Sequence, residues 1–136
     1  MQLLKIPEKV EQILGALQAK MAKDIITMEM FEVMTATDYM VICTGDSAPQ
    51  IRALADNVEM RLRQLGSRPM SIQGISNAKW VLLDYGDVLV NIFDDEYRRF
   101  YELEKLWLDA PRRIEPDQPP DQLINRLSTA KGIANV

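Results

Sequence analysis

Histidine is absent from the 136-residue chain, and this absence excludes more chemistry than any other feature of the composition. Ser-His-Asp and Cys-His catalysis need an imidazole to move a proton, and His-based zinc sites need one as a ligand. The only cysteine, Cys43, cannot form an internal disulfide. Because it lies in the apolar run 40–43 with no base nearby in the sequence, we expect a buried, unreactive thiol. A reducing, cytoplasmic location is the simplest expectation for such a chain.

Long apolar runs are also missing. No run reaches about 18 apolar residues, so no segment is predicted to span a membrane. Charges at Lys5, Glu8, Lys9 and Glu11 interrupt the N-terminal region, which is therefore not expected to act as a secretory signal. The net charge is −4, and an acidic chain is repelled by bare nucleic acid, so no direct nucleic-acid specificity is expected. Hydrophobic residues make up 47% of the chain, enough for the core of one domain.

Two helices are indicated before the middle of the chain. Apolar residues recur at the helical period over 7–21, which predicts the first helix. The second has the clearest start and end. Ser47 can cap it, Pro49 fits its first turn, Gln50 occupies the capping-box position, and Gly66 suits the residue after its last turn.

A third helix is expected from about Asp94 to Trp107. Carboxylates at its start favour the positive end of the helix dipole. At helical spacing, Phe100 and Leu103 are the expected core positions, whereas Tyr101 lies further around the helix and is the better surface candidate.

Short apolar segments between these helices predict strands. Residues 39–44 form a continuous apolar run, as expected for a central strand buried on both faces. Two runs flanking Gly86 predict a β-hairpin. The expected fold class is therefore α/β, with a single mixed sheet of about five strands and helices packed on it. The expected strands cover residues 24–30, 39–44, 68–73, 79–84 and 88–93.

The character of the chain changes after Pro111. Residues 115–121 contain three prolines, which exclude an ordinary helix or central strand and indicate a linker. The sequence thus predicts one domain over residues 1–113, followed by a Pro-rich linker and C-terminal tail over 114–136.

Two adjacent segments carry a resemblance to a known family. Residues 79–93 read KWVLLDYGDVLVNIF, and residues 96–107 read EYRRFYELEKLW. Together they resemble the signature of the ribosomal silencing factor (RsfS/Iojap) family, and residues 37–45 also resemble a family segment. The resemblance covers about residues 5–110 and ends before the tail. Where the family usually has histidine, this chain has Asn91, which cannot become charged.

This resemblance implies a fold and a function. The fold would be nucleotidyltransferase-like in topology but without the catalytic motif, and no cofactor or metal is expected. The family is described as binding the large ribosomal subunit through its fourteenth ribosomal protein, at the face where the small subunit docks. Members slow translation and tend to form homodimers when free. An acidic chain fits a basic ribosomal protein better than RNA.

The candidate partner-binding residues lie around the hairpin and the third helix. Trp80 could be a core or edge residue, or an exposed anchor, since tryptophan is enriched in interface hot spots. The resemblance favours the anchor. Charged residues on the helix are expected to flank the aromatic side chains. The expected set is Trp80, Phe93, Asp94, Arg98, Tyr101 and Glu104.

A metal-dependent nucleotidyltransferase is the alternative. It would use Asp84 and Asp87 as metal ligands, but such enzymes need two acidic residues alternating on one strand, and no Asp-x-Asp occurs here. Asp46 next to Ser47 would also repel a phosphate. We therefore expect a binding protein without enzymatic activity. A dimeric scaffold with another partner is a third interpretation.

Overall fold

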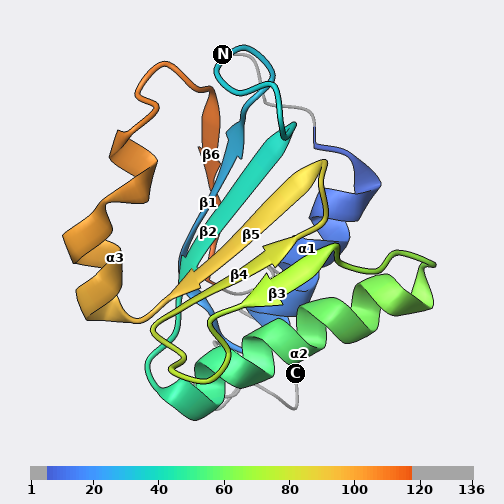
Figure 1. Ribbon diagram of the computed structural model, residues 1–136, viewed down its shortest axis with the longest axis vertical. Coiled ribbons are helices and arrows are strands. Elements are labelled where there is room, and N and C mark those ends of the chain that lie inside the picture. Colours follow the sequence, from blue (N-terminus) through green and yellow to red (C-terminus); the bar gives the residue numbers. More distant parts are fainter. Residues whose placement is uncertain (1–5, 118–136) are drawn as a thin grey trace, which may run out of the picture.

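A computed structural model of the chain describes residues 6–117 and contains one mixed sheet with helices on both faces (Figure 1). The six strands lie in the order β3-β4-β5-β2-β1-β6. Only β2 and β5 are parallel neighbours, and every other neighbouring pair is antiparallel. The elements are α1 (Glu8–Ala19), β1 (Lys23–Glu29), β2 (Tyr39–Thr44), α2 (Ala48–Gln64), β3 (Ser71–Gln73), β4 (Trp80–Asp84), β5 (Val88–Phe93), α3 (Asp95–Tyr101), the 3-10 turn η1 (Leu103–Lys105) and β6 (Arg112–Ile114).

The central strand is β2, and all six of its residues are buried. It lies between β1 and β5, so its backbone is hydrogen-bonded on both edges and its side chains enter both cores. The prediction of a strand buried on both faces is confirmed. The β4–β5 hairpin is also confirmed, with Trp80 opposite Phe93 and Asp84 opposite Leu89.

Helices α1 and α2 cover one face of the sheet (Figure 1). The predicted start of α2 is confirmed, because the Ser47 hydroxyl accepts a hydrogen bond from the Gln50 N–H at 3.2 Å. Gly66 follows the helix with a φ of +85°, a conformation that glycine adopts without strain. The core on this face contains Val10, Ile13, Leu17, Ile51, Leu54, Val58, Val41, Val90 and Ile92.

The other face has a smaller core beneath α3 and η1 (Figure 1). The expectation of one helix from Asp94 to Trp107 is wrong. The α-helix ends after Tyr101, because Glu102 adopts a left-handed conformation with a φ of +45° and the chain continues as η1. The buried apolar side chains on this face are Met28, Met30, Met40, Ile42, Phe93 and Ala110.

A sixth strand, β6, extends the sheet beyond the expected five. It pairs antiparallel with β1, from Ile26 opposite Ile114 to Met28 opposite Arg112. The expected domain boundary after residue 113 therefore falls inside a strand. A strand of three residues is too short to show an alternating pattern, so the sequence gives no periodic signal for it. Within residues 6–117, no helix is long and apolar enough to cross a membrane.

Candidate functional site: an aromatic surface

The open end of the β4–β5 hairpin positions the candidate site. Trp80 is the first residue of β4 and pairs with Phe93, the last residue of β5. Helix α3 begins directly after β5, and Asp94 caps it by accepting a hydrogen bond from the Tyr97 N–H at 2.7 Å. Asp94 also pairs with Lys79 across a distance of 3.3 Å. These contacts hold the start of the helix against the start of the hairpin.

Aromatic rings from both elements meet at this junction. The Trp80 ring stacks on Phe93 with centroids 4.8 Å apart, and it contacts the Tyr101 ring at 5.0 Å. Tyr101 in turn contacts Tyr97 at 5.7 Å and Phe100 at 5.0 Å. We call Trp80, Tyr97, Phe100 and Tyr101 the aromatic surface. Phe100 is 77% exposed and Tyr101 is 44% exposed, so this ring cluster faces solvent.

Two of the expected partner-binding residues lie at this surface as the sequence suggested. Trp80 is half-buried and Tyr101 is exposed, and their rings are in direct contact. Asp94 lies at the edge of the same junction, with its side chain 20% exposed. Phe93, in contrast, is fully buried. It can support Trp80 from below but offers no surface to a partner, which corrects its expected role.

Arg98 and Glu104 also differ from their expected place at the rim. Arg98 is only 8% exposed. Its Nε lies 3.1 Å from a Glu104 carboxylate oxygen, and its guanidinium donates a hydrogen bond to the Thr44 hydroxyl at 2.9 Å. In a continuous helix, residues six apart point in directions about 120° apart, so this pair requires the break at Glu102. Arg98 therefore joins α3, η1 and the end of β2.

Sequence reasoning placed Phe100 in the core, whereas the structure places it at the surface. The side of α3 that faces the sheet carries Tyr97 and Arg98 instead, and a charged arginine gives no sequence signal for a buried position. A left-handed residue at a helix end is usually glycine or asparagine, and Glu102 carries no such signal. Leu106 and Leu108, which follow the break, are also exposed, at 64% and 77%. Leu103 packs partly against the smaller core, as expected in part.

Asn91 is a further residue of the site, which the sequence analysis noted only as a departure from the family's usual histidine and did not include in the expected partner-binding set. Its side chain is 2% exposed, and its amide oxygen accepts a hydrogen bond from the Trp80 indole N–H at 2.9 Å. The two residues come from neighbouring strands and share one face of the sheet. An asparagine within an otherwise apolar strand was the available signal, although its partner could not be read from the sequence.

The carboxylates proposed for the nucleotidyltransferase alternative have other partners. Asp84 accepts a hydrogen bond from the Gly86 N–H at 2.8 Å, which shapes the hairpin turn. Asp87 pairs with Lys9 at 2.8 Å, and Asp46 pairs with Lys23 at 2.9 Å. A hydrogen bond from Lys23 to Asp46 is also the main reason why the pKa of Lys23 is raised. These contacts are those of turns and surface ion pairs.

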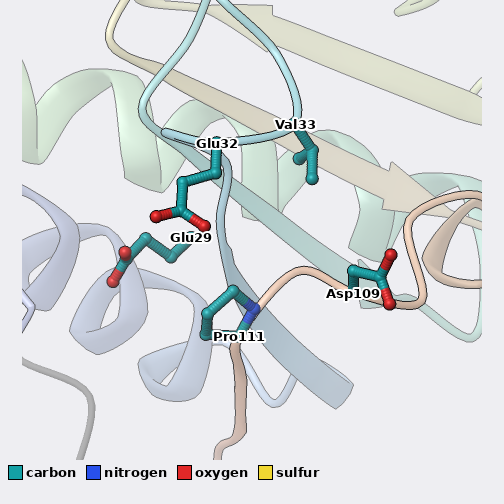
Figure 2. Close-up of a pocket in the computed structure, with 5 residues that line it drawn as sticks. All are labelled: Glu29, Glu32, Val33, Asp109 and Pro111. Carbon is teal, nitrogen blue, oxygen red and sulfur yellow. The ribbon is translucent and has the colours of Figure 1, made fainter.

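An open cavity of about 280 Å³ lies between the end of β1 and the connection from η1 to β6. Figure 2 shows Glu29 and Glu32 on one side of it and Asp109 on the other. Val33 and Pro111 complete its lining. None of these residues belongs to the aromatic surface, so the cavity is a separate feature of the molecule.

Comparison with known proteins identifies the family. The family model described as "Ribosomal silencing factor during starvation" (RsfS) matches residues 4–134. The chain belongs to the ribosomal silencing factor family. The match continues past Arg113, where the sequence resemblance was expected to end, so family similarity extends into the tail.

The silencing factor relatives agree in sequence and in fold. The chain is 38% identical over 97 residues to the ribosomal silencing factor RsfS of Bacillus subtilis, covering 71% of this chain and 82% of the relative. It is similar to a crystal structure from Chromobacterium violaceum, with a TM-score of 0.73 and 33% identity, covering 76% of this chain and 87% of that one. A mouse relative is named "Mitochondrial assembly of ribosomal large subunit protein 1", at 29% identity, covering 72% of this chain and 44% of the relative. Both the family and the mixed α/β fold inferred from the sequence are thus confirmed.

Proposed function

We propose that this silencing factor represses translation by binding the large ribosomal subunit through its fourteenth ribosomal protein, at the face that meets the small subunit. Membership of the family implies ribosome-associated regulation of translation. The observation that carries the more specific proposal is the solvent-facing ring cluster around Trp80 and Tyr101. Bound at that face, the protein would exclude the small subunit by its bulk alone.

The aromatic surface has the physical properties of a binding anchor. Tryptophan and tyrosine dominate interface hot spots because they bury a large area while losing few rotatable bonds. Here the rings already contact one another and rest on the buried Phe93, so binding would freeze little additional motion. Anchors held in place before binding lose less conformational entropy on association.

Charge supports a basic protein partner. The chain carries a net charge of −4, and Asp95 and Glu96 are exposed in the first turn of α3, next to the aromatic surface. Acidic groups at the edge of an interface attract a basic surface and speed encounter with it. Exclusion by bulk also needs no reactive centre, which agrees with the structural roles of Asp84, Asp87 and Asp46.

Co-sedimentation with purified large subunits tests this proposal. We expect wild-type protein to migrate with large subunits, and Trp80→Ala and Tyr101→Ala each to weaken binding by about 2 kcal/mol, or about thirtyfold. Phe31→Ala is the matched control, since Phe31 is an aromatic side chain that is 50% exposed and lies outside the aromatic surface. Its binding should equal wild type.

Denaturant unfolding of the same variants separates binding from folding. If Trp80 acted mainly as a core residue, its truncation would cost roughly 3–5 kcal/mol of stability. Normal binding by both alanine variants, or loss of binding only in variants that unfold, would exclude the aromatic surface as the docking site. Failure of the wild-type protein to sediment with large subunits would contradict the function itself.

A further inference from the structure

The indole N–H of Trp80 is already bound inside the protein. It donates to the side-chain amide oxygen of Asn91 at 2.9 Å. An indole N–H can only donate, so the accepting atom must be the oxygen, and this fixes the orientation of the Asn91 amide. A partner that docks on Trp80 therefore contacts only ring carbon atoms, because the one hydrogen-bond donor of this side chain is already used.

Asn91 makes this contact at a cost in stability. Its amide nitrogen is buried and has no hydrogen-bond partner within the described part of the chain. On either side along the sheet, its neighbours in register are Ile42 and Leu82. A buried polar group without a partner is unfavourable, whereas an apolar side chain of similar size among apolar neighbours is not. Leucine at this position would remove the unpaired nitrogen, but it would also leave the Trp80 indole N–H without its acceptor.

The hydrogen bond determines which edge of the Trp80 ring is exposed, whereas ring stacking does not. Stacking on Phe93 holds the plane of the Trp80 ring, but it is also satisfied when the ring turns by about 180° about χ2, which exchanges the two ring edges. A directional hydrogen bond at the indole nitrogen removes this freedom and orients the exposed edge of the ring. Side chains at binding sites are often fixed in this way by buried polar neighbours that never touch the partner.

We propose that Asn91 is a positioning residue, which orients Trp80 so that its carbon edge is presented to an apolar patch of a protein partner. This inference rests on the proposed docking function and assigns Asn91 a part in it. Asn91 contacts no partner itself, because it is 2% exposed. Its effect on binding must pass through Trp80.

Nuclear magnetic resonance of the free protein tests the first half of the proposal without ribosomes. The indole N–H signal of Trp80 is identified by its loss in Trp80→Phe, and Trp107, the only other tryptophan, is the internal reference. We expect Asn91→Leu to shift the Trp80 signal and speed its exchange with water, while denaturant unfolding shows that the variant remains folded. Asn91→Val serves as a second apolar variant in case leucine packs poorly.

Thr27→Val is the matched control. Thr27 is fully buried in β1, and its hydroxyl has no partner among residues 6–117, so this variant also replaces an unpaired buried group. It should leave the Trp80 signal and subunit binding unchanged. An unaltered Trp80 signal in both Asn91 variants would overturn the proposal, whatever the ribosome measurements give.

A double-mutant cycle of large-subunit binding tests the second half. We expect Asn91→Leu to weaken binding by about threefold to tenfold in the wild-type background. In the Trp80→Phe background, which lacks the indole N–H, Asn91→Leu should have no further effect. Equal losses in both backgrounds, or no loss in either, would overturn the positioning role. Absence of binding by the wild-type protein is a distinct result, which would contradict the proposed function.

Discussion

Cys43 lies in the central strand, where burial should make its thiol unreactive. The residue is fully buried, and burial raises its pKa to about 12. The thiolate is the reactive form, and it is scarce at neutral pH for a group with such a pKa. Native protein should therefore react slowly with a disulfide reagent at pH 8, and unfolded protein should react fast. Rapid native labelling would show that β2 is not the buried strand described here.

The raised pKa of Cys43 should make the folded protein less stable at alkaline pH. Because the folded-state pKa of Cys43 lies above the ordinary thiol value of 9.0, the unfolded chain releases this proton first as pH rises. The contribution of Cys43 to stability is complete below about pH 9 and is lost progressively between there and about pH 12.

Arg98 is the residue whose observed place differs most from the expected one. Arg98→Ala would leave the Glu104 carboxylate without its cation, and one oxygen of that carboxylate is already buried without a partner in the described structure. Breaking a largely buried pair by removing one member costs about 3 kcal/mol. We expect urea unfolding to show a loss of this order.

Arg99→Ala is the control for this prediction. Arg99 pairs with Asp95 at 2.8 Å, but its side chain is 75% exposed, and exposed pairs add little to stability. Its unfolding midpoint should stay close to wild type. Equal losses in the two variants would indicate that helix propensity, rather than the buried ion pair, accounts for the change.

At the scale of elements, the predictions succeeded where local signals and tertiary packing agree. The limits of α2 follow from Ser47 and Gly66, whose roles depend only on nearby backbone. The strands β2, β4 and β5 follow from apolar runs and a hairpin turn. In each case the residues that determine the element lie within it or next to it.

The predictions failed where a distant contact decides the local structure. Helix α3 ends at Tyr101 in an arrangement that joins Arg98 to Glu104 and to Thr44, which is 54 residues away along the chain. Strand β6 exists because β1 offers an edge to pair with. The aromatic surface was therefore predicted only in part. Arg98, rather than Phe100, occupies the buried side of α3, and the position of Glu104 depends on the break at Glu102.

Strand β6 should contribute to stability despite its length of three residues. Arg112 donates hydrogen bonds to the carbonyls of Ala110, Glu104 and Trp107, and Arg113 pairs with Glu11 on α1. A chain ending after Pro111 loses these contacts and exposes an edge of β1. We expect a loss of about 2 kcal/mol, or roughly 10 °C in melting temperature.

A chain ending after Asp117 is the control, since it keeps every strand and helix described here. It should melt close to the full-length protein. A chain ending after Arg113, within β6, should fall between the two. Equal melting temperatures for the chains ending after Pro111 and Asp117 would show that β6 adds nothing to stability.

For the whole molecule, the uneven covering of the sheet suggests self-association. Helices α1 and α2 cover one face, whereas the side of α3 and η1 leaves Phe100, Leu106 and Leu108 exposed. Large exposed apolar side chains on this side of the molecule favour contact with another surface. We expect light scattering at micromolar concentration to give twice the chain mass of 15.6 kDa. A monomer mass would contradict this expectation.

Dilution of the protein tests whether dimer formation competes with ribosome binding. If the aromatic surface serves both the dimer and the ribosome, the two states compete for it, and docking requires the dimer to separate. At a constant concentration of large subunits, the fraction of chains that is bound should then rise as the protein is diluted. A bound fraction that does not change with protein concentration would show that the dimer and the ribosome contact different surfaces.

The most direct test of the account is the rate at which purified large and small subunits join, followed by light scattering after mixing. Large subunits incubated with saturating wild-type protein should join slowly or not at all, because the docked molecule occupies the intersubunit face. Tyr101→Ala should need about thirtyfold more protein for the same effect, and Phe31→Ala should act like wild type. Normal joining in the presence of bound wild-type protein would contradict the claim that this chain represses translation by keeping the subunits apart.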